Sequence, residues 1–248
     1  MLDGKCLRLT KVVKKGVNKM VYFYELVVTA YLNKDIPFQN AQEVISIQVN
    51  EAMKGDKQLS ERHTAPGLKF YNFSSFYPLE EDKIYKANNI YIFRVRSIDH
   101  QFIQKISKLI KKGDAQYFNV LATEVIKKHQ QFITQLYTVT PIVVTVARNT
   151  HWQIGQDFEQ FKKQLHNNTE KKYNQFYNKD IAAEPFFEGI ELLNPQTIVV
   201  PYKQGYLMGN KLRLHIKHDD VSQCLAHVVL GCGLGEKNSL GMGYCHAH

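Results

Sequence analysis

The chain has 248 residues, of which 44% are hydrophobic and 22% are charged. This composition is ordinary for a globular protein and argues against a disordered chain, and the length suits two compact domains. No apolar run approaches the roughly 20 residues that a membrane helix needs, and the N-terminal residues lack the layout of a secretory signal. We therefore expect a cytoplasmic protein without a membrane partner.

The formal net charge is +9, and an excess of Lys and Arg attracts phosphate backbones. Many basic proteins bind nothing anionic, so the charge alone does not decide between classes of function. The 14 tyrosines and 14 phenylalanines offer faces on which bases stack, although most such rings belong to hydrophobic cores. These two features favour a nucleic-acid partner without requiring one.

In the first half of the chain, strand-like alternation and helix-like stripes of apolar residues follow one another. Asn40 and Glu43 have the spacing of a capping box at the start of one helix, and Asp99 caps a second helix that Gly113 ends. The predicted elements are a strand over residues 20–32, a helix from 41 to about 55, strands over 68–76 and 90–97, a helix over 100–112 and a strand over 117–125. Their order, β-α-β-β-α-β, is that of a ferredoxin-like unit.

The second half repeats this order of elements. It predicts a strand over residues 141–147, a helix over 157–176, strands over 186–193, 197–202 and 212–216, a helix from Asp219 and a final strand over 241–245. We therefore expect an α+β protein of two tandem ferredoxin-like (βαββαβ) domains. The boundary has no clear breaker, and we place the domains at residues 1–130 and 131–248.

A glycine-rich segment lies between the last predicted helix and the last predicted strand. Two Gly-apolar-Gly triplets, at residues 233–235 and 241–243, flank a five-residue stretch that contains Lys237 and Asn238. A structural turn needs one or two glycines rather than four, and exposed N–H groups together with Lys237 can hold phosphates. The segment follows a helix and precedes a strand, which is the reverse of the Rossmann context, and it lacks the Gly-Lys-Ser/Thr of a P-loop.

This segment is similar to the C-terminal glycine-rich loop of the CRISPR-associated repeat endoribonucleases, the sixth family of Cas proteins in the RAMP superfamily. A second stretch also resembles that family, because His63 precedes Lys-Phe-Tyr-Asn-Phe-Ser at residues 69–74. The resemblance covers essentially the whole chain. It implies two ferredoxin-like folds and an endonuclease of antiviral defence that cuts precursor CRISPR RNA within each repeat to release guide RNAs.

The resemblance also implies a mechanism and its residues. The ribose 2′-hydroxyl would attack the adjacent phosphate without a metal, leaving a 2′,3′-cyclic phosphate and a 5′-hydroxyl. His63, on an exposed loop at residues 60–67, would move a proton, and Lys69, at the start of the next strand, would supply positive charge. The residues expected to bind RNA are Gly233, Gly235, Lys237, Asn238, Gly241 and Gly243.

One feature of the family is missing from this sequence. Some members take a tyrosine base from the first helix, and no tyrosine lies between Asn40 and Lys57. Tyr71 is a weak substitute, so the general base stays unassigned. The nine other histidines have structural roles by default, and Trp152 either stacks on a base or anchors the core.

No metal site or cofactor is expected. The four cysteines, Cys6, Cys224, Cys232 and Cys245, include no Cys-x-x-Cys pair, so we expect buried, reduced thiols. His215 and His218 form a candidate pair of metal ligands but have no third ligand at a suitable spacing.

Two other functions stay open. The first is a non-catalytic RNA-binding subunit of a CRISPR effector complex, whose other subunits would then be partners beside the repeat RNA. His63 with Lys69 discriminates against it, because a pure binder needs no acid–base residue. The second is a ferredoxin-like protein that binds a small anionic ligand, which leaves the basic excess and the long loop unexplained.

Overall fold

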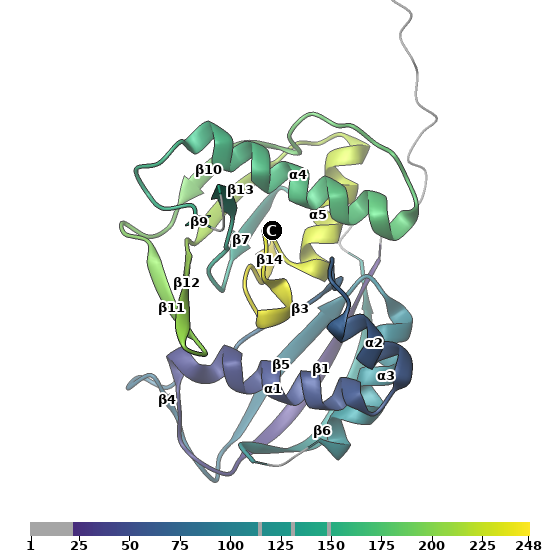
Figure 1. The fold of residues 1–248 in the computed structure, drawn as a ribbon, viewed down its shortest axis with the longest axis vertical. Coiled ribbons are helices and arrows are strands. Elements are labelled where there is room, and N and C mark those ends of the chain that lie inside the picture. Colours follow the sequence, from purple (N-terminus) through teal and green to yellow (C-terminus); the bar gives the residue numbers. More distant parts are fainter. Residues whose placement is uncertain (1–21, 114–115, 130–131, 148–149) are drawn as a thin grey trace, which may run out of the picture.

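The computed structural model describes residues 22–113, 116–129, 132–147 and 150–248. Two four-stranded antiparallel sheets form its frame, one from each half of the chain. Figure 1 shows the first half below and the second half above, with the segment that leads into the last strand between them.

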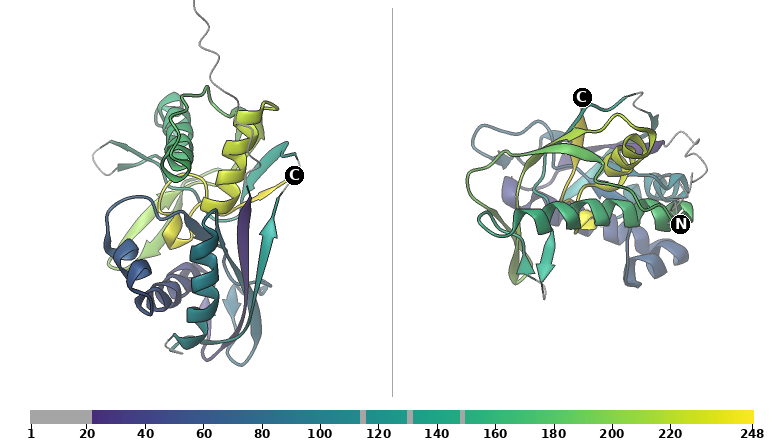
Figure 2. Two further views of the ribbon diagram at one scale, coloured as in Figure 1. Left: turned by 90° about the vertical axis from the view of Figure 1, so that its right-hand side faces the viewer. Right: turned by 90° about the horizontal axis from the view of Figure 1, so that it is seen from above.

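The first sheet has the strand order β3-β5-β1-β6, and helices cover one of its faces (Figure 2). In the central strand, alternate residues such as Leu26, Val28 and Ala30 are buried, and they share a core with Phe102 and Ile106. The elements are β1 (Phe23–Leu32), α1 (Ala41–Lys54), α2 (Lys57–Thr64), β3 (Tyr71–Phe73), β5 (Ile90–Ser97), α3 (His100–Leu109) and β6 (Phe118–Lys128).

The second sheet has the order β10-β13-β7-β14 and repeats the same succession. Its elements are β7 (Gln135–Thr138), α4 (Phe158–Tyr177), β10 (Phe187–Leu192), β13 (Leu212–Ile216), α5 (Asp220–Cys232) and β14 (Cys245–Ala247). A hairpin of β11 (Ile198–Tyr202) and β12 (Gly205–Gly209) is inserted between β10 and β13. Both units have the order βαββαβ, so the predicted α+β fold of two ferredoxin-like domains is confirmed.

Short elements complete the fold. β2 (Ile36–Pro37) pairs with β4 (Ile84–Tyr85), and β8 (Thr145–Ala147) pairs with β9 (Thr150–His151). Turns of 3₁₀ helix are η1 (Phe38–Asn40), η2 (Ile110–Lys112) and η3 (Asn238–Leu240). None of the helices in the described part of the chain is both long and apolar enough to cross a bilayer.

Aspartate caps begin four of the described helices, and the cap that the sequence predicts at Asp99 is confirmed. The carboxylates of Asp99, Asp157 and Asp219 accept hydrogen bonds from the backbone N–H three residues later, at the starts of α3, α4 and α5. Each such cap stabilises a helix by about 1 kcal/mol. The predicted strand over residues 90–97 is also confirmed as β5.

The predicted capping box at Asn40 is wrong. Asn40 is the last residue of η1 and has helical angles (φ −96°, ψ −8°), so its side chain makes no hydrogen bond to the start of α1. A residue accepts the first N–H of a helix through its side chain only from an extended conformation. The 3₁₀ turn before α1 removes that conformation.

Three predicted strands have the wrong extent. The first strand of the second sheet is β7, and of residues 141–147 only Thr145–Ala147 form a strand, which pairs outside that sheet. The strand over residues 68–76 shrinks to β3. The last strand begins at Cys245 rather than 241, because Gly241 and Gly243 have positive φ angles that a strand does not contain.

The two halves meet through a buried arginine. The Arg96 guanidinium donates to Glu25 Oε2 at 2.6 Å within the first sheet and to Cys245 O at 2.7 Å in β14 of the second. It also lies 4.4 Å from the centre of the Tyr244 ring. Two large cores, one per half, come together around this contact.

Some sequence predictions lie outside the described residues. They concern the start of the first strand at residue 20 and the thiol of Cys6. The strands of the first sheet end at residue 128 and those of the second begin at 135, whereas the division at 130/131 stays a prediction.

Candidate functional site

A cleft of about 250 Å³ lies where the two halves meet. One wall is the segment 67–71 that leads from α2 into β3, and another is α4, through Asn168 and Lys172. The third is the glycine-rich segment, through residues 235–239. Lys69 and Lys237 are predicted site residues from opposite ends of the sequence, and both line this one cleft.

His63 lies in the last turn of α2 rather than in a loop, and its backbone carbonyl accepts from the ammonium of Lys69, which lines the cleft, at 3.0 Å. The helix begins at Asp56, whose carboxylate accepts from Leu59 N–H, and it continues through Thr64. The His63 side chain is exposed. Partial burial of the ring lowers its pKa, and the nearby charges of Lys69, Lys54 and Lys203 lower it further. The imidazole is therefore neutral at pH 7 and able to accept a proton.

Lys69 holds the end of the helix that carries His63. Its ammonium donates to the carbonyl oxygens of Arg62 at 2.6 Å and His63 at 3.0 Å, and also to that of Ala65. A cation is favoured at a helix C-terminus, where carbonyl groups lack partners. Lys69 lies just before β3 rather than in it, and burial lowers its pKa.

The glycines of the glycine-rich segment are needed because the backbone there packs closely against other parts of the chain. A Cβ atom on Gly235, whose φ is +67°, would lie 2.7 Å from Val143 O, and one on Gly243 would lie 2.0 Å from Leu234 O. The expectation that the glycine N–H groups are exposed is wrong for Gly233, Gly241 and Gly243, whose N–H groups bond to carbonyls within the chain. The Lys237 side chain is exposed and makes no ion pair with a described residue.

Asn238 and Lys172 tie this segment to α4. The Lys172 ammonium donates to Gly233 O at 2.8 Å, Gly235 O at 2.7 Å and Asn238 Oδ1 at 2.6 Å. The Asn238 amide in turn donates to Leu234 O and Met242 O, at 3.1 and 2.9 Å. Sequence reasoning missed Lys172, because a lysine in a polar helix is normally solvated, whereas this side chain is 3% exposed.

Tyr71 lines the cleft but does not fit a base. The residue is 2% exposed, and its ring stacks on Phe102 with 4.7 Å between centroids. Burial raises the pKa of its hydroxyl well above the usual value. The hydroxyl therefore keeps its proton near neutral pH.

Trp152 is a core residue rather than a stacking platform. It is 3% exposed, its ring stacks on Phe161 at 4.2 Å, and its indole N–H donates to Asp157 O at 3.0 Å. Its neighbour His151 accepts a hydrogen bond from Met208 N–H at 3.2 Å. Burial lowers the His151 pKa, and the charge of Lys237 lowers it further.

The described residues contain no group of three or more His, Cys, Asp or Glu side chains that would hold a metal. His215 bonds to Glu191 at 2.7 Å, and His218 contacts the Phe132 ring. The thiols of Cys232 and Cys245 are buried and free, as expected, whereas Cys224 is only half-buried.

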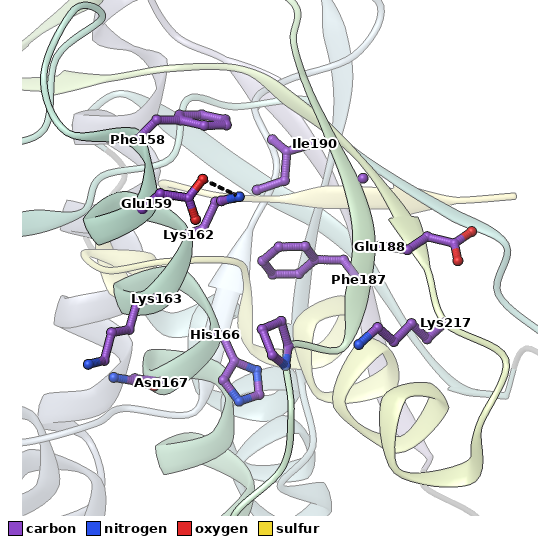
Figure 3. Close-up of a pocket in the computed structure, with 12 residues that line it drawn as sticks. Phe158, Glu159, Lys162, Lys163, His166, Asn167, Phe187, Glu188, Ile190 and Lys217 are labelled. Atoms are coloured by element: carbon purple, nitrogen blue, oxygen red, sulfur yellow. Dashed lines mark ion pairs between the residues drawn. The ribbon is translucent and has the colours of Figure 1, made fainter.

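A second hollow lies outside the cleft, between α4 and β10 (Figure 3). Lys162, Lys163 and His166 face it from α4, and Phe187 and Ile190 face it from the strand. Lys162 forms an ion pair with Glu159 at 2.6 Å, drawn as a dashed line in Figure 3. None of the residues predicted from the sequence lines this hollow.

Comparison with known proteins identifies the family. The sequence model described as "CRISPR associated protein Cas6, C-terminal" matches residues 121–247, just over half of the chain. The CRISPR-associated endoribonuclease Cas6 2 of Methanocaldococcus jannaschii is 26% identical over 209 residues, which cover 76% of this chain and 85% of that protein.

Solved structures share the fold at 20% identity. A CRISPR associated protein Cas6 has a TM-score of 0.70 and a RAMP protein that binds different RNA substrates has 0.72, each covering 91% of this chain and 99% of its own. A Cas6-related protein from Pyrococcus furiosus has a TM-score of 0.69, with 91% and 98% covered. On the family match and the shared tandem fold, the chain belongs to the Cas6 family of CRISPR-associated proteins.

Proposed function

We propose that this protein is an endoribonuclease that cuts CRISPR repeat RNA to generate guide RNAs in the cytoplasm. Its membership of the Cas6 family and its relative named an endoribonuclease support this activity. The observation that carries the proposal is the cleft that Lys69 and the exposed Lys237 line together, with the carbonyl of His63 bonded to the Lys69 ammonium.

The proposed reaction is an internal transfer at phosphorus. His63 accepts the proton of the 2′-hydroxyl as its oxygen bonds to the adjacent phosphorus atom. The bond from phosphorus to the 5′ oxygen breaks, and that oxygen takes up a proton from water, which leaves a 2′,3′-cyclic phosphate and a 5′-hydroxyl. Positive charge beside the cleft stabilises the dianionic phosphorane that forms between these steps.

Lys69 supports this chemistry indirectly. Its ammonium is bonded to three carbonyl groups at the end of α2. The side chain therefore holds the turn that carries His63, and after partial burial its charge is the next cause that lowers the pKa of the imidazole. Because the RNA backbone enters the same cleft, the charge also attracts phosphate.

Cleavage in the presence of a chelator tests the proposal. We expect the protein to cut its repeat RNA in EDTA, because the described residues contain no cluster of metal ligands. A 2′-deoxy nucleotide immediately before the cut should block the reaction, since the nucleophile is absent. Gel analysis of end-labelled RNA measures both results, and cleavage of the deoxy substrate at the normal rate would refute the 2′-hydroxyl mechanism.

The second candidate is an RNA-binding subunit of a CRISPR effector complex without cleavage activity. The commitment of the Lys69 ammonium to backbone carbonyls favours it, because that group is not free to stabilise a reacting phosphate. Tight binding of intact repeat RNA, with no cut product under any of these conditions, would establish this function instead. Other effector subunits would then be expected partners.

A further inference from the structure

The ammonium of Lys172 occupies the centre of the glycine-rich segment. It is buried, and its three N–H groups meet three acceptors, which are Gly233 O, Gly235 O and Asn238 Oδ1. Gly233 and Gly235 belong to the first Gly-apolar-Gly triplet, and Asn238 reaches across to Met242 of the second. One side chain of α4 therefore bonds to one triplet directly and to the other through Asn238.

No carboxylate contacts this ammonium among the described residues. Glu236 is the nearest acid that affects it, and the Glu236 carboxylate is turned away to accept from Thr145 N–H at 3.1 Å and Thr145 Oγ at 2.7 Å. The thiols of Cys232 and Cys245 face Lys172 from α5 and β14 and are protonated. A buried charge without a counter-ion costs free energy unless its hydrogen bonds are complete, and here they are.

We propose that Lys172 is a positioning residue for RNA, which fixes the glycine-rich segment so that Lys237 faces the cleft. This inference rests on the proposed function. Lys237 itself has a positive φ of +56°, and it lies between Gly235 O and Asn238 Oδ1, both held by Lys172. Without the ammonium, three buried acceptors lose their donors and the conformation at Lys237 loses its support on both sides.

The alternative is that Lys172 stabilises the fold and nothing more. A general loss of stability lowers the fraction of folded protein and leaves the effect of every other substitution unchanged. A positioning residue that acts through Lys237 behaves differently, because once it is lost the Lys237 side chain no longer meets the RNA. The two roles therefore differ in whether Lys172 and Lys237 are coupled.

A double-mutant cycle measures this coupling. Lys172→Met, Lys237→Ala and the double variant are compared with the natural protein by filter binding to 2′-deoxy repeat RNA at several salt concentrations, and by single-turnover cleavage. Lys237→Ala alone should weaken binding and reduce the salt slope by about 1, as expected for one lost phosphate contact. Lys172→Met should produce the same change in slope, and the double variant should bind as Lys172→Met does, within about twofold.

Cleavage should fall in Lys172→Met by on the order of 10²-fold, which is the cost of misplacing a reacting group by about 1 Å. Lys171→Met is the matched control, because Lys171 is the exposed neighbour on α4 and removes the same charge without touching the segment. It should cleave as the natural protein does. Equal losses from Lys237→Ala in both backgrounds would overturn the proposal.

Hydrogen exchange keeps the proposal testable without activity or RNA. Peptides spanning residues 233–243 should exchange faster in Lys172→Met, and also in Asn238→Ala, which serves if Lys172→Met does not fold. Unchanged exchange in a folded variant would refute the proposal that Lys172 fixes the glycine-rich segment. If the natural protein cuts no repeat RNA, the proposed function fails, while the exchange data and the binding cycle still decide the role of Lys172.

Discussion

His63 is the residue on which the proposed chemistry depends most directly. If its imidazole moves a proton in the transition state, His63→Ala should lower the single-turnover cleavage rate by about 10²–10⁴-fold. RNA binding should change little, because a neutral imidazole contributes little to phosphate attraction. The side chain is exposed, so the free energy of unfolding should change by no more than about 0.5 kcal/mol.

The loss of cleavage, the unchanged RNA binding and the unchanged stability have to occur together. Filter binding checks the second result, and unfolding followed by circular dichroism checks the third. His218→Ala is a suitable control, since His218 is also exposed and does not line the cleft. Loss of binding together with cleavage would make His63 a contact residue. Full cleavage by His63→Ala would assign the proton transfer to another group.

Single residues also show how far the sequence could lead. His63, Lys69 and Lys237 were found from sequence patterns, and the structure places the two lysines in one cleft with His63 beside it. Lys172 had no such pattern, because only the tertiary fold brings α4 against the glycine-rich segment. The half-buried amide of Asn238 was predicted as an RNA contact, and its side chain bonds within the protein.

At the scale of one element, the pKa of His63 in α2 depends on Lys69, whose ammonium bonds to the carbonyl groups at the end of that helix. Burial lowers this pKa below 6.5, and repulsion from Lys69 is the next cause. As a base, His63 is active when neutral, so the cleavage rate should fall on acidification at a lower pH than an unperturbed imidazole would give. Lys69→Met removes one repelling charge and should move this fall towards higher pH.

The pH dependence of single-turnover cleavage and an NMR titration of the His63 ring measure the same pKa. Both should show an upward shift in Lys69→Met, because removing a nearby positive charge makes protonation easier. Lys112→Met is the control, as Lys112 is exposed and is not among the charges that affect His63. An unshifted His63 titration in Lys69→Met would contradict the assigned cause.

Elements differ in how well the sequence predicts them, and the reason is local. Helices α3, α4 and α5 each begin with an aspartate that bonds to the backbone nearby, so a short stretch contains the whole signal. Strand β7 has four residues and no flanking breaker, and it becomes a strand only by pairing with β13 and β14 from the other end of the unit. Its place in the sheet is therefore a tertiary property.

At the scale of the whole molecule, Arg96 joins the two halves. It pairs with Glu25, which is 4% exposed, and it donates to the carbonyl of Cys245 in the second sheet. Arg96→Met should lower the free energy of unfolding by about 3–5 kcal/mol, because it leaves the Glu25 carboxylate buried without its partner. Denaturant unfolding measures this change.

Arg94→Met is the matched control on the same strand and face. The Arg94 side chain is 35% exposed and lies 3.7 Å from the same carboxylate, so its loss should cost at most about 1 kcal/mol. Equal costs for the two variants would show that burial does not govern these pairs. Strand alternation is enough to put both arginines on one face of β5, whereas no local pattern indicates the Glu25 partner 71 positions away or the contact with the second sheet.

Two thiols lie at this same junction between the halves. Cys232 receives a hydrogen bond from the Ile98 backbone of the first half, and Cys245 lies in the strand that Arg96 contacts. Burial raises the pKa of each thiol to about 12. Alkylating reagents attack thiolates, so these cysteines react only in molecules whose structure around the thiols has transiently opened. Alkylation of Cys232 and Cys245 therefore reports on this opening without an engineered probe. Mass spectrometry of peptides distinguishes it from alkylation of Cys6 and of the half-buried Cys224.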